Sequence, residues 1–211
     1  MTDAVPKRMG KNRKESAALL GVLALIMALA GCGGQKDTLR FVYEKTGIPD
    51  QECVSYEVDI GREAGGAAVT VELWEDGECT ASTPLTLGRE TEALHISLLA
   101  EGRGTEKDGL YVQIETGEIS GSLLTYFALL TGWTGYSFSA YKDGDILPVH
   151  AGEEIVLAAM AFDTGNGVRS VSCPALTDGT ETLEDEACVL VIRAAFTAER
   201  IGPQASAEEC G

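Results

Sequence analysis

The stretch CVSYEVDI, residues 53–60, alternates apolar and polar side chains with a period of two. Val54, Tyr56, Val58 and Ile60 fall on one face, and the residues between them are polar. Successive side chains of an extended chain point to opposite faces, so this pattern predicts a β-strand with one buried and one solvated face.

The same alternation recurs along the chain, and tight-turn signals separate its copies. Asp-Gly dipeptides at 76–77, 143–144 and 178–179 tolerate positive φ and are typical of β-hairpins. We expect SAYKDGDILPV, residues 139–149, to form one such hairpin. The inward positions of the further strands are Val69, Val71 and Leu73, then Leu94, Ile96 and Leu98, then Leu110, Val112 and Ile114, then Tyr136, Phe138 and Ala140.

Two runs are apolar on both faces, residues 155–162 and residues 188–192 with their continuation to Phe196. This is typical of central strands that are buried on both sides, although a buried helix has the same signature. Residues 122–130 fit a helical stripe or a strand, and we predict a strand. The chain therefore indicates an all-β fold, an antiparallel β-sandwich with immunoglobulin-like features.

The N-terminal region has the pattern of a secretory signal peptide. Residues 17–30 form an apolar run that, as a helix, is about 21 Å long, shorter than a bilayer core of about 30 Å. A basic flank precedes the run and small residues end it. The alternative is an uncleaved anchor helix.

The end of the run, Leu29-Ala30-Gly31-Cys32, resembles the lipobox of bacterial lipoprotein precursors. In that family the cysteine thiol takes a diacylglycerol and the chain is cut just before it. The resemblance implies that residues 1–31 are removed and that Cys32 is lipidated. It places the protein on the extracytoplasmic face of the cell membrane.

Residues 32–37 are then a short tether, residues 38–200 the β-sandwich domain and residues 201–211 a flexible C-terminal tail. Removal of five basic and two acidic side chains with residues 1–31 changes the formal net charge from −17 to −20. Such a body repels nucleic acid and anionic lipid, so we expect no nucleic-acid partner and a membrane contact made by the lipid on Cys32.

Export permits disulfides, and four cysteines have suggestive positions. The midpoint between Cys173 and Cys188 is at position 180.5, close to the Asp178-Gly179 dipeptide, so a hairpin centred in this region would make the two cysteines cross-strand neighbours. Cys53 begins one predicted strand and Cys79 follows the next, which predicts the same sheet edge for both. Free thiols are the alternative. Without a C-x-x-C pair, zinc is less favoured.

Phe162-Asp163-Thr164-Gly165 resembles the Asp-Thr-Gly turn of aspartic peptidases, in which two aspartates share a proton. The chain has one copy, Asn166 replaces the usual small residue, and a dimer would have to supply the second aspartate. The other interpretation is a Gly/Asn-rich turn in which Asp163 accepts backbone N–H bonds. Two pairs of residues also offer oxygen atoms that suit Ca²⁺, namely Asp163 with Asn166 and Asp143 with Asp145. Neither pair follows the spacing of an EF-hand loop.

Other candidates give little support for chemistry. His95 is predicted on an outer strand face with Ser97, and His150 in a loop. The chain has no G-x-S-x-G and no H-E-x-x-H motif, and we predict no cofactor and no metal. The aromatic residues that are candidates for an exposed platform for sugars or a protein partner are Trp74, Trp133, Tyr111 and Tyr141.

These features predict a membrane-anchored surface lipoprotein with a non-catalytic β-sandwich module that binds a protein or a glycan, or serves a structural role. The alternatives are a dimeric aspartic-peptidase-like enzyme that uses Asp163 and an accessory subunit of an envelope complex.

Overall fold

The computed structural model describes residues 37–61, 63–88, 91–101, 109–116, 122–128, 133–163, 167, 170–183 and 188–199. The chain divides into two units, Met1–Gln35 and Lys36–Gly211, and the described residues belong to the second. The predicted signal peptide, Cys32 with its predicted lipid, and the predicted tail at 201–211 lie outside the described residues. Among the described residues, no helix has the length and apolar character that crossing a membrane requires.

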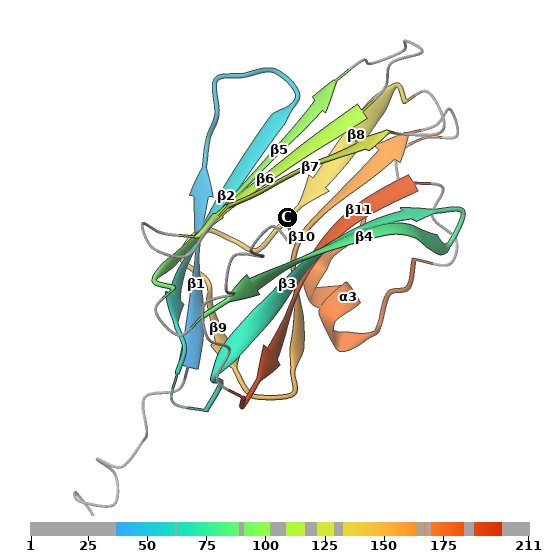
Figure 1. Ribbon diagram of the computed structural model, residues 1–211. Coiled ribbons are helices and arrows are strands. Elements are labelled where there is room, and N and C mark those ends of the chain that lie inside the picture. Colours follow the sequence, from blue (N-terminus) through green and yellow to red (C-terminus); the bar gives the residue numbers. More distant parts are fainter. Residues whose placement is uncertain are drawn as a thin grey trace, which may run out of the picture. The chain divides into compact units, whose positions relative to one another are not determined.

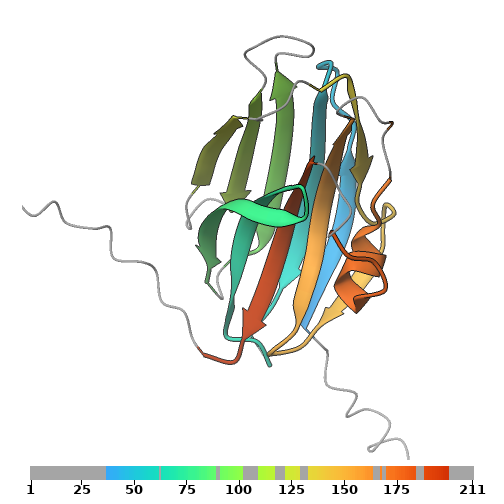
Figure 2. The same cartoon turned by 90° about the vertical axis from the view of Figure 1, so that its right-hand side faces the viewer.

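The described residues form two antiparallel sheets, which confirms the predicted all-β antiparallel sandwich (Figures 1 and 2). The six-stranded sheet has the order β7-β6-β5-β2-β1-β9, and the five-stranded sheet has the order β4-β3-β11-β10-β8. The strands of the first sheet are β1 (Asp37–Glu44), β2 (Gln51–Asp59), β5 (Ala93–Glu101), β6 (Gly109–Thr116), β7 (Ser122–Ala128) and β9 (Ile146–Val149). Those of the second are β3 (Gly66–Glu75), β4 (Glu78–Leu87), β8 (Gly135–Ser139), β10 (Glu154–Asp163) and β11 (Cys188–Thr197), and the helix is α3 (Cys173–Asp178).

The main core lies between the sheets and is built from the alternating positions that the sequence indicated. The inward positions of β2, β3, β5 and β6 are nearly all buried, as are both faces of β10 and most of β11. Residues 122–128 form β7, so the strand predicted for the ambiguous segment is confirmed over this range.

A β-bulge in β10 lets residues before and after the bulge contribute to the core between the sheets. The register with β11 shifts between Val156 and Ala158, so Leu157 is an extra residue. Leu157 and Ala158 both face the core between the sheets. The alternation of inward and outward side chains along β10 is therefore shifted by one residue at this point. As a result Ile155 before the bulge and Met160 after it reach the same core.

The bulge also positions a hydrogen bond that joins the two sheets. The hydroxyl of Tyr56, on β2, donates to the carbonyl oxygen of Leu157 at 2.6 Å. Tyr56 is fully buried and packs edge-on against Phe41 of β1, with ring centroids 5.3 Å apart. A buried carbonyl needs a donor, and Tyr56 supplies one from the opposite sheet.

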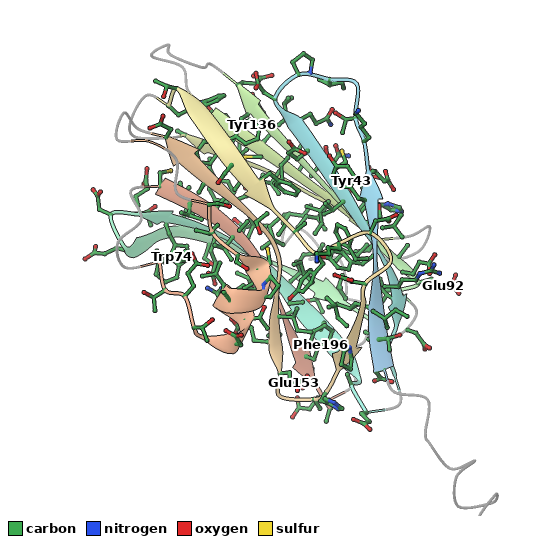
Figure 3. All side chains as sticks on the ribbon, turned by 180° about the vertical axis from the view of Figure 1, so that it is seen from behind. Tyr43, Trp74, Glu92, Tyr136, Glu153 and Phe196 are labelled. Atoms are coloured by element: carbon green, nitrogen blue, oxygen red, sulfur yellow. The ribbon has the colours of Figure 1, made fainter. Side chains whose placement is uncertain are left out.

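A second inter-sheet contact closes one end of the sandwich. Glu52, on β2, accepts hydrogen bonds from the hydroxyls of Tyr136 at 3.2 Å and Tyr43 at 3.5 Å. Burial, aided by the charge of Glu52, raises the pKa of Tyr136 to about 12. Figure 3 shows Tyr43 and Tyr136 at this end, and Glu153 and Phe196 at the opposite end.

The first strand is fixed at its N-terminal residue. Asp37 is fully buried, and its Oδ2 accepts backbone N–H groups from Gly61, Glu63 and Ala64 at 2.8–3.1 Å. These donors belong to the connection between β2 and β3, which crosses from one sheet to the other. One carboxylate therefore holds the start of β1 against that crossover.

The outer face of the five-stranded sheet is covered over β10 and β11. A short segment with α3 packs on it and forms a second apolar cluster with Val156, Ala159 and Val189. Ser172 caps the helix, proline lies in its first turn and Gly179 ends it in the left-handed region, at φ 74°. Figures 1 and 2 show α3 beside β10 and β11.

This helix overturns one cysteine prediction. The Asp178-Gly179 dipeptide ends α3 and does not turn a hairpin, so Cys173 begins a helix while Cys188 begins β11. Cys53 and Cys79 also lie on different sheets, not at one sheet edge. The four cysteines in the described part of the chain are all free. The local turn chemistry was read correctly as a reversal, but a helix end uses the same residues.

The hairpin expected at residues 139–149 is also wrong in its pairing. Asp143 and Gly144 do form a tight turn, closed by the Asp145 N–H donating to the Lys142 carbonyl at 2.9 Å. However, β8 before the turn pairs with β10, and β9 after it pairs with β1 in the other sheet. The Asp76-Gly77 turn, with both residues at positive φ, does join the paired strands β3 and β4.

We predict that Tyr56→Phe lowers the free energy of unfolding by about 1–3 kcal/mol, because it leaves the buried Leu157 carbonyl without its donor. Tyr111→Phe is the matched control, because Tyr111 is exposed, and it should change stability by less than about 0.5 kcal/mol. Urea unfolding of both variants measures the difference. Equal stability of the two variants would contradict the role of the inter-sheet bond.

We also predict that, of the four cysteines in the described residues, Cys79 is alkylated first in the folded protein and Cys173 and Cys188 last. Burial raises the pKa of Cys173 to about 11 and that of Cys188 to about 12, whereas Cys79 is exposed. The thiolate is the reactive form, so both buried thiols stay unreactive until the pH nears those values. Because these folded-state pKa values are raised, the associated stability is present below the unfolded thiol pKa and lost as pH rises through them.

Iodoacetamide labelling at a series of pH values, read peptide by peptide in a mass spectrometer, measures this order. Labelling in urea is the control, in which all four thiols should react alike. A disulfide-linked peptide that joins Cys173 to Cys188 would contradict the structure.

Candidate functional site

The outer faces of the two sheets differ in how they are covered. α3 and its segment seal much of the five-stranded sheet. On the six-stranded sheet many of the outward side chains are exposed, among them Arg40, Glu57, His95, Tyr111 and Leu124. A sheet face that is not used for packing is available for binding, which makes this face the candidate site.

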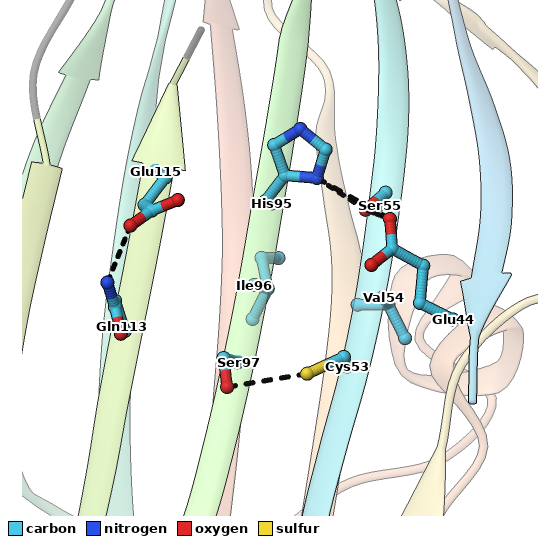
Figure 4. Close-up of a pocket in the computed structure, with 9 residues that line it drawn as sticks. All are labelled: Glu44, Cys53, Val54, Ser55, His95, Ile96, Ser97, Gln113 and Glu115. Atoms are coloured by element: carbon cyan, nitrogen blue, oxygen red, sulfur yellow. Dashed lines mark hydrogen bonds and ion pairs between the residues drawn. The ribbon is translucent and has the colours of Figure 1, made fainter. Parts of the chain in front are cut away.

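A depression of about 320 Å³ lies on this open face (Figure 4). Its polar lining comes from four neighbouring strands: Glu44 on β1, Cys53 and Ser55 on β2, His95 and Ser97 on β5, and Gln113 and Glu115 on β6.

Strand register brings these residues together. Ser55 is opposite His95, and His95 is opposite Glu115, in one row across β2, β5 and β6. In the next row Cys53 is opposite Ser97, which is opposite Gln113, and Glu44 is opposite Cys53. Directly opposed residues on one face have neighbouring side chains, so the rows form a continuous polar surface.

His95, Ser55 and Glu44 form a hydrogen-bonded chain. The Ser55 hydroxyl lies 2.5 Å from Glu44 Oε1 and 2.6 Å from His95 Nδ1. Serine has one hydroxyl proton, so when it donates to the carboxylate it accepts from the imidazole Nδ1–H. In neutral His95 the lone pair is then on Nε2, which Figure 4 shows pointing away from Ser55.

This order differs from that of a serine hydrolase. There the imidazole takes the serine proton and the carboxylate holds the imidazole. Here Ser55 lies between the imidazole and the carboxylate and is only 6% exposed. Its hydroxyl donates a hydrogen bond to the carboxylate of Glu44. Ser55 therefore fixes the positions of His95 and Glu44, both about half exposed, and does not present a nucleophile.

Other donor groups at the depression are also hydrogen-bonded to neighbouring side chains. The Cys53 thiol and Gln51 Nε2 both donate to Ser97 Oγ, at 3.4 and 2.7 Å. Gln113 Nε2 donates to Glu115 Oε1 at 2.6 Å. Gln51 Oε1, beside Ser97, is a buried acceptor for which the described residues provide no hydrogen-bond partner.

The surface that remains is rich in acceptors. It presents the carboxylates of Glu44 and Glu115 beside the imidazole of His95, and its lining contains no Lys or Arg. Such a site suits a ligand that brings several hydroxyl or amino groups. The described residues contain no cluster of three or more His, Cys, Asp or Glu that would hold a metal ion.

Asp163 ends β10 and has a structural environment. Its Oδ1 accepts the Gly167 N–H and its Oδ2 accepts the Thr134 hydroxyl, both at 2.9 Å. The predicted backbone N–H bond within the turn is confirmed. Asn166 lies outside the described residues. Asp163 does not approach the depression, which β1, β2, β5 and β6 line in the other sheet.

The aromatic candidates divide between burial and exposure. Trp133 is fully buried against Tyr136 and Phe162, so its prediction as an exposed aromatic is wrong. Trp74 and Tyr141 are half-buried and pack against the α3 cluster. Tyr111 is exposed, and the sequence analysis missed its ring partner Tyr126 on β7.

The remaining candidates have local roles. His150 Nδ1 is 2.8 Å from Glu63 Oε2, at the end of the sandwich near Asp37. Asp143 accepts the Tyr43 N–H at 3.2 Å, and Asp145 accepts the Lys142 N–H at 2.9 Å. Both aspartates therefore support the turn between β8 and β9.

Sequence reasoning placed His95 and Ser97 on an outer face but missed their partners. The signal was the set of polar positions between the buried ones on β2 and β5, and it becomes a site only when the pairing of the strands is known.

Comparison with family models, with curated proteins and with solved structures gives no match for this chain.

Proposed function

We propose that this protein is a bacterial lipoprotein, held at the extracytoplasmic face of the cell membrane by a lipid on Cys32, whose β-sandwich binds a glycan. The binding surface is the outer face of the six-stranded sheet, around the depression between Glu44 and Glu115. Its role is binding without catalysis.

The observation that carries this proposal is the acceptor-rich depression on the uncovered sheet face. Glycans present many hydroxyl groups, and a site of this kind recognises them through hydrogen bonds to carboxylate and imidazole acceptors. The His95–Ser55–Glu44 chain holds two of these acceptors in place before a ligand arrives. Such pre-organisation lowers the entropy cost of binding.

The position of the site agrees with anchoring at the N-terminus. The polypeptide that leads from the lipid on Cys32 would enter the sandwich at Asp37, the first residue of β1. Glu44 is at the other end of the same strand. Seven residue steps in a strand span about 24 Å. The depression therefore lies toward the end of the domain that is remote from Asp37.

The immunoglobulin-like relation stays part of this proposal. It is supported by the β1–β2 pair in one sheet, the following β3–β4 pair in the other, and the return of β5 to the side of β2. In an immunoglobulin domain the last strand lies at a sheet edge, whereas here β11 is central, between β3 and β10.

A non-catalytic role is supported by the surroundings of the two groups that suggested chemistry. Both carboxylate oxygens of Asp163 accept hydrogen bonds from the protein, and Ser55 is almost completely buried. A peptidase would need a second Asp163 from another copy to face the first.

We predict that Cys32→Ser blocks processing and releases any mature protein from the membrane, because the thiol that carries the lipid is lost. Membrane fractionation and intact-mass analysis measure the change. Cys79→Ser is the control, since Cys79 is exposed on β4 and should leave localisation unchanged. An unmodified Cys32 in membrane-bound mature protein would refute the anchor.

We predict that Ser97→Arg abolishes glycan binding, because a long cation would fill the depression and pair with its carboxylates. The measurement is binding of the mature protein to a glycan array, with a peptide array beside it. Ser82→Arg, an exposed serine on β4 in the other sheet, is the matched control and should bind as the wild type does.

Glycan binding that survives Ser97→Arg would remove the depression as the site. Binding to peptides alone, lost in Ser97→Arg, would keep the site but replace the glycan with a protein ligand.

A further inference from the structure

Two tyrosines form an exposed aromatic surface on the open sheet face. Tyr111 on β6 and Tyr126 on β7 are opposite each other, and their ring centroids are 4.8 Å apart with planes inclined by 48°. Tyr111 is 39% and Tyr126 48% exposed, which is high for rings already in mutual contact. Their free surfaces are directed away from the core.

Gly109 holds this arrangement in place. The ring of Tyr126 lies across Gly109, where any Cβ would overlap its side-chain atoms. A glycine in a strand costs stability, and cover by a cross-strand aromatic ring is a known compensation. The ring position is thus set by the backbone beneath it.

The tyrosine pair continues the depression along one strand. Tyr111, Gln113 and Glu115 are outward positions of β6, each about 7 Å from the next. Gln113 and Glu115 line the depression, so aromatic rings and acceptors form one stripe. A chain of about three sugar rings would cover the roughly 14 Å from Glu115 to Tyr111.

Charge along this stripe has a single sign. β5, β6 and β7 contain no Lys or Arg, while Glu101 and Glu115 lie on their exposed outer faces. Glu101 is opposite Gly109, next to the tyrosines, and Glu115 is at the other end. Carboxylates and the faces of tyrosine rings both attract a cation, so the two parts of the stripe select the same chemistry.

We propose that Tyr111 and Tyr126 form a stacking subsite that extends the depression, and that the ligand is an oligosaccharide of amino sugars with free amines. This inference rests on the proposed function and names its ligand class. The apolar faces of the sugar rings lie on the tyrosines, and the ammonium groups meet Glu101, Glu115 and Glu44. Anionic glycans are excluded by the same carboxylates.

The experiment is calorimetric titration of the full-length mature protein with four hexasaccharides of equal length. They are hexaglucosamine, hexa-N-acetylglucosamine, cellohexaose and hexagalacturonate, at a pH at which the amines are protonated. We expect hexaglucosamine to bind at least about tenfold more tightly than the two neutral chains, and hexagalacturonate not to bind.

Variants separate the subsite from the depression. Gly109→Ala displaces the Tyr126 ring without changing its chemistry, and Tyr126→Ala removes the ring, so the second remains informative where the first affects folding. Each should weaken hexaglucosamine binding by about tenfold or more. Ile146→Ala, exposed on the opposite edge strand of the same sheet, is the matched control and should change nothing. Thermal unfolding verifies the fold of each variant.

The outcomes distinguish this inference from the proposed function. Hexaglucosamine binding that Ser97→Arg abolishes but Tyr126→Ala and Gly109→Ala leave intact overturns the subsite and supports the depression. Equal binding of neutral or anionic hexamers overturns the amino-sugar assignment. If no hexamer binds while an array glycan does so through Ser97, this inference fails and the proposed function stands. If no glycan binds at all, both fail.

Discussion

The hydrogen bond from Tyr56 to the Leu157 carbonyl is the contact on which the packing of the two sheets depends. It exists because β10 carries one extra residue at this point, which turns Leu157 and Ala158 to the same side. Without the bulge, Met160 and Phe162 would face the α3 side, and the small residues Ala159 and Ala161 would face the core. The bulge therefore decides which residues fill the space between the sheets, and Tyr56 satisfies the carbonyl that it leaves unpaired within the ladder.

The strands were predictable because alternation is a local property. Val54 and Tyr56, or Leu94 and Ile96, face inward wherever their strand lies in the sandwich. The bulge in β10 could not be predicted, because residues 155–162 are apolar at every position. In such a run the sequence does not reveal where the side chains switch faces. Pairing was equally hidden. The Asp143-Gly144 turn reverses the chain as expected, but local turn chemistry does not decide whether the following strand joins the same sheet.

The short helix shows a different limit. Ser172, a proline in the first turn and Gly179 are helix-boundary signals, yet the six residues of α3 are too few to show a helical period. The candidate site was harder still. Glu44, Ser55 and His95 come from three strands that are distant in sequence, and only the register places them together. Polar residues between buried ones look like ordinary solvated positions until their neighbours across the sheet are known.

If the protein is anchored through its N-terminus as proposed, the buried carboxylate of Asp37 has a mechanical consequence. A pull between the proposed ligand and the proposed anchor would run along β1, which is hydrogen-bonded to β2 on one side and to β9 on the other. Force directed along a strand loads these bonds together in shear instead of opening them one at a time. The three N–H groups on Asp37 add a lock at the point where the load enters. Resistance to such a load is set by the rate of unfolding, so this corner of the sandwich governs how long the domain survives under tension.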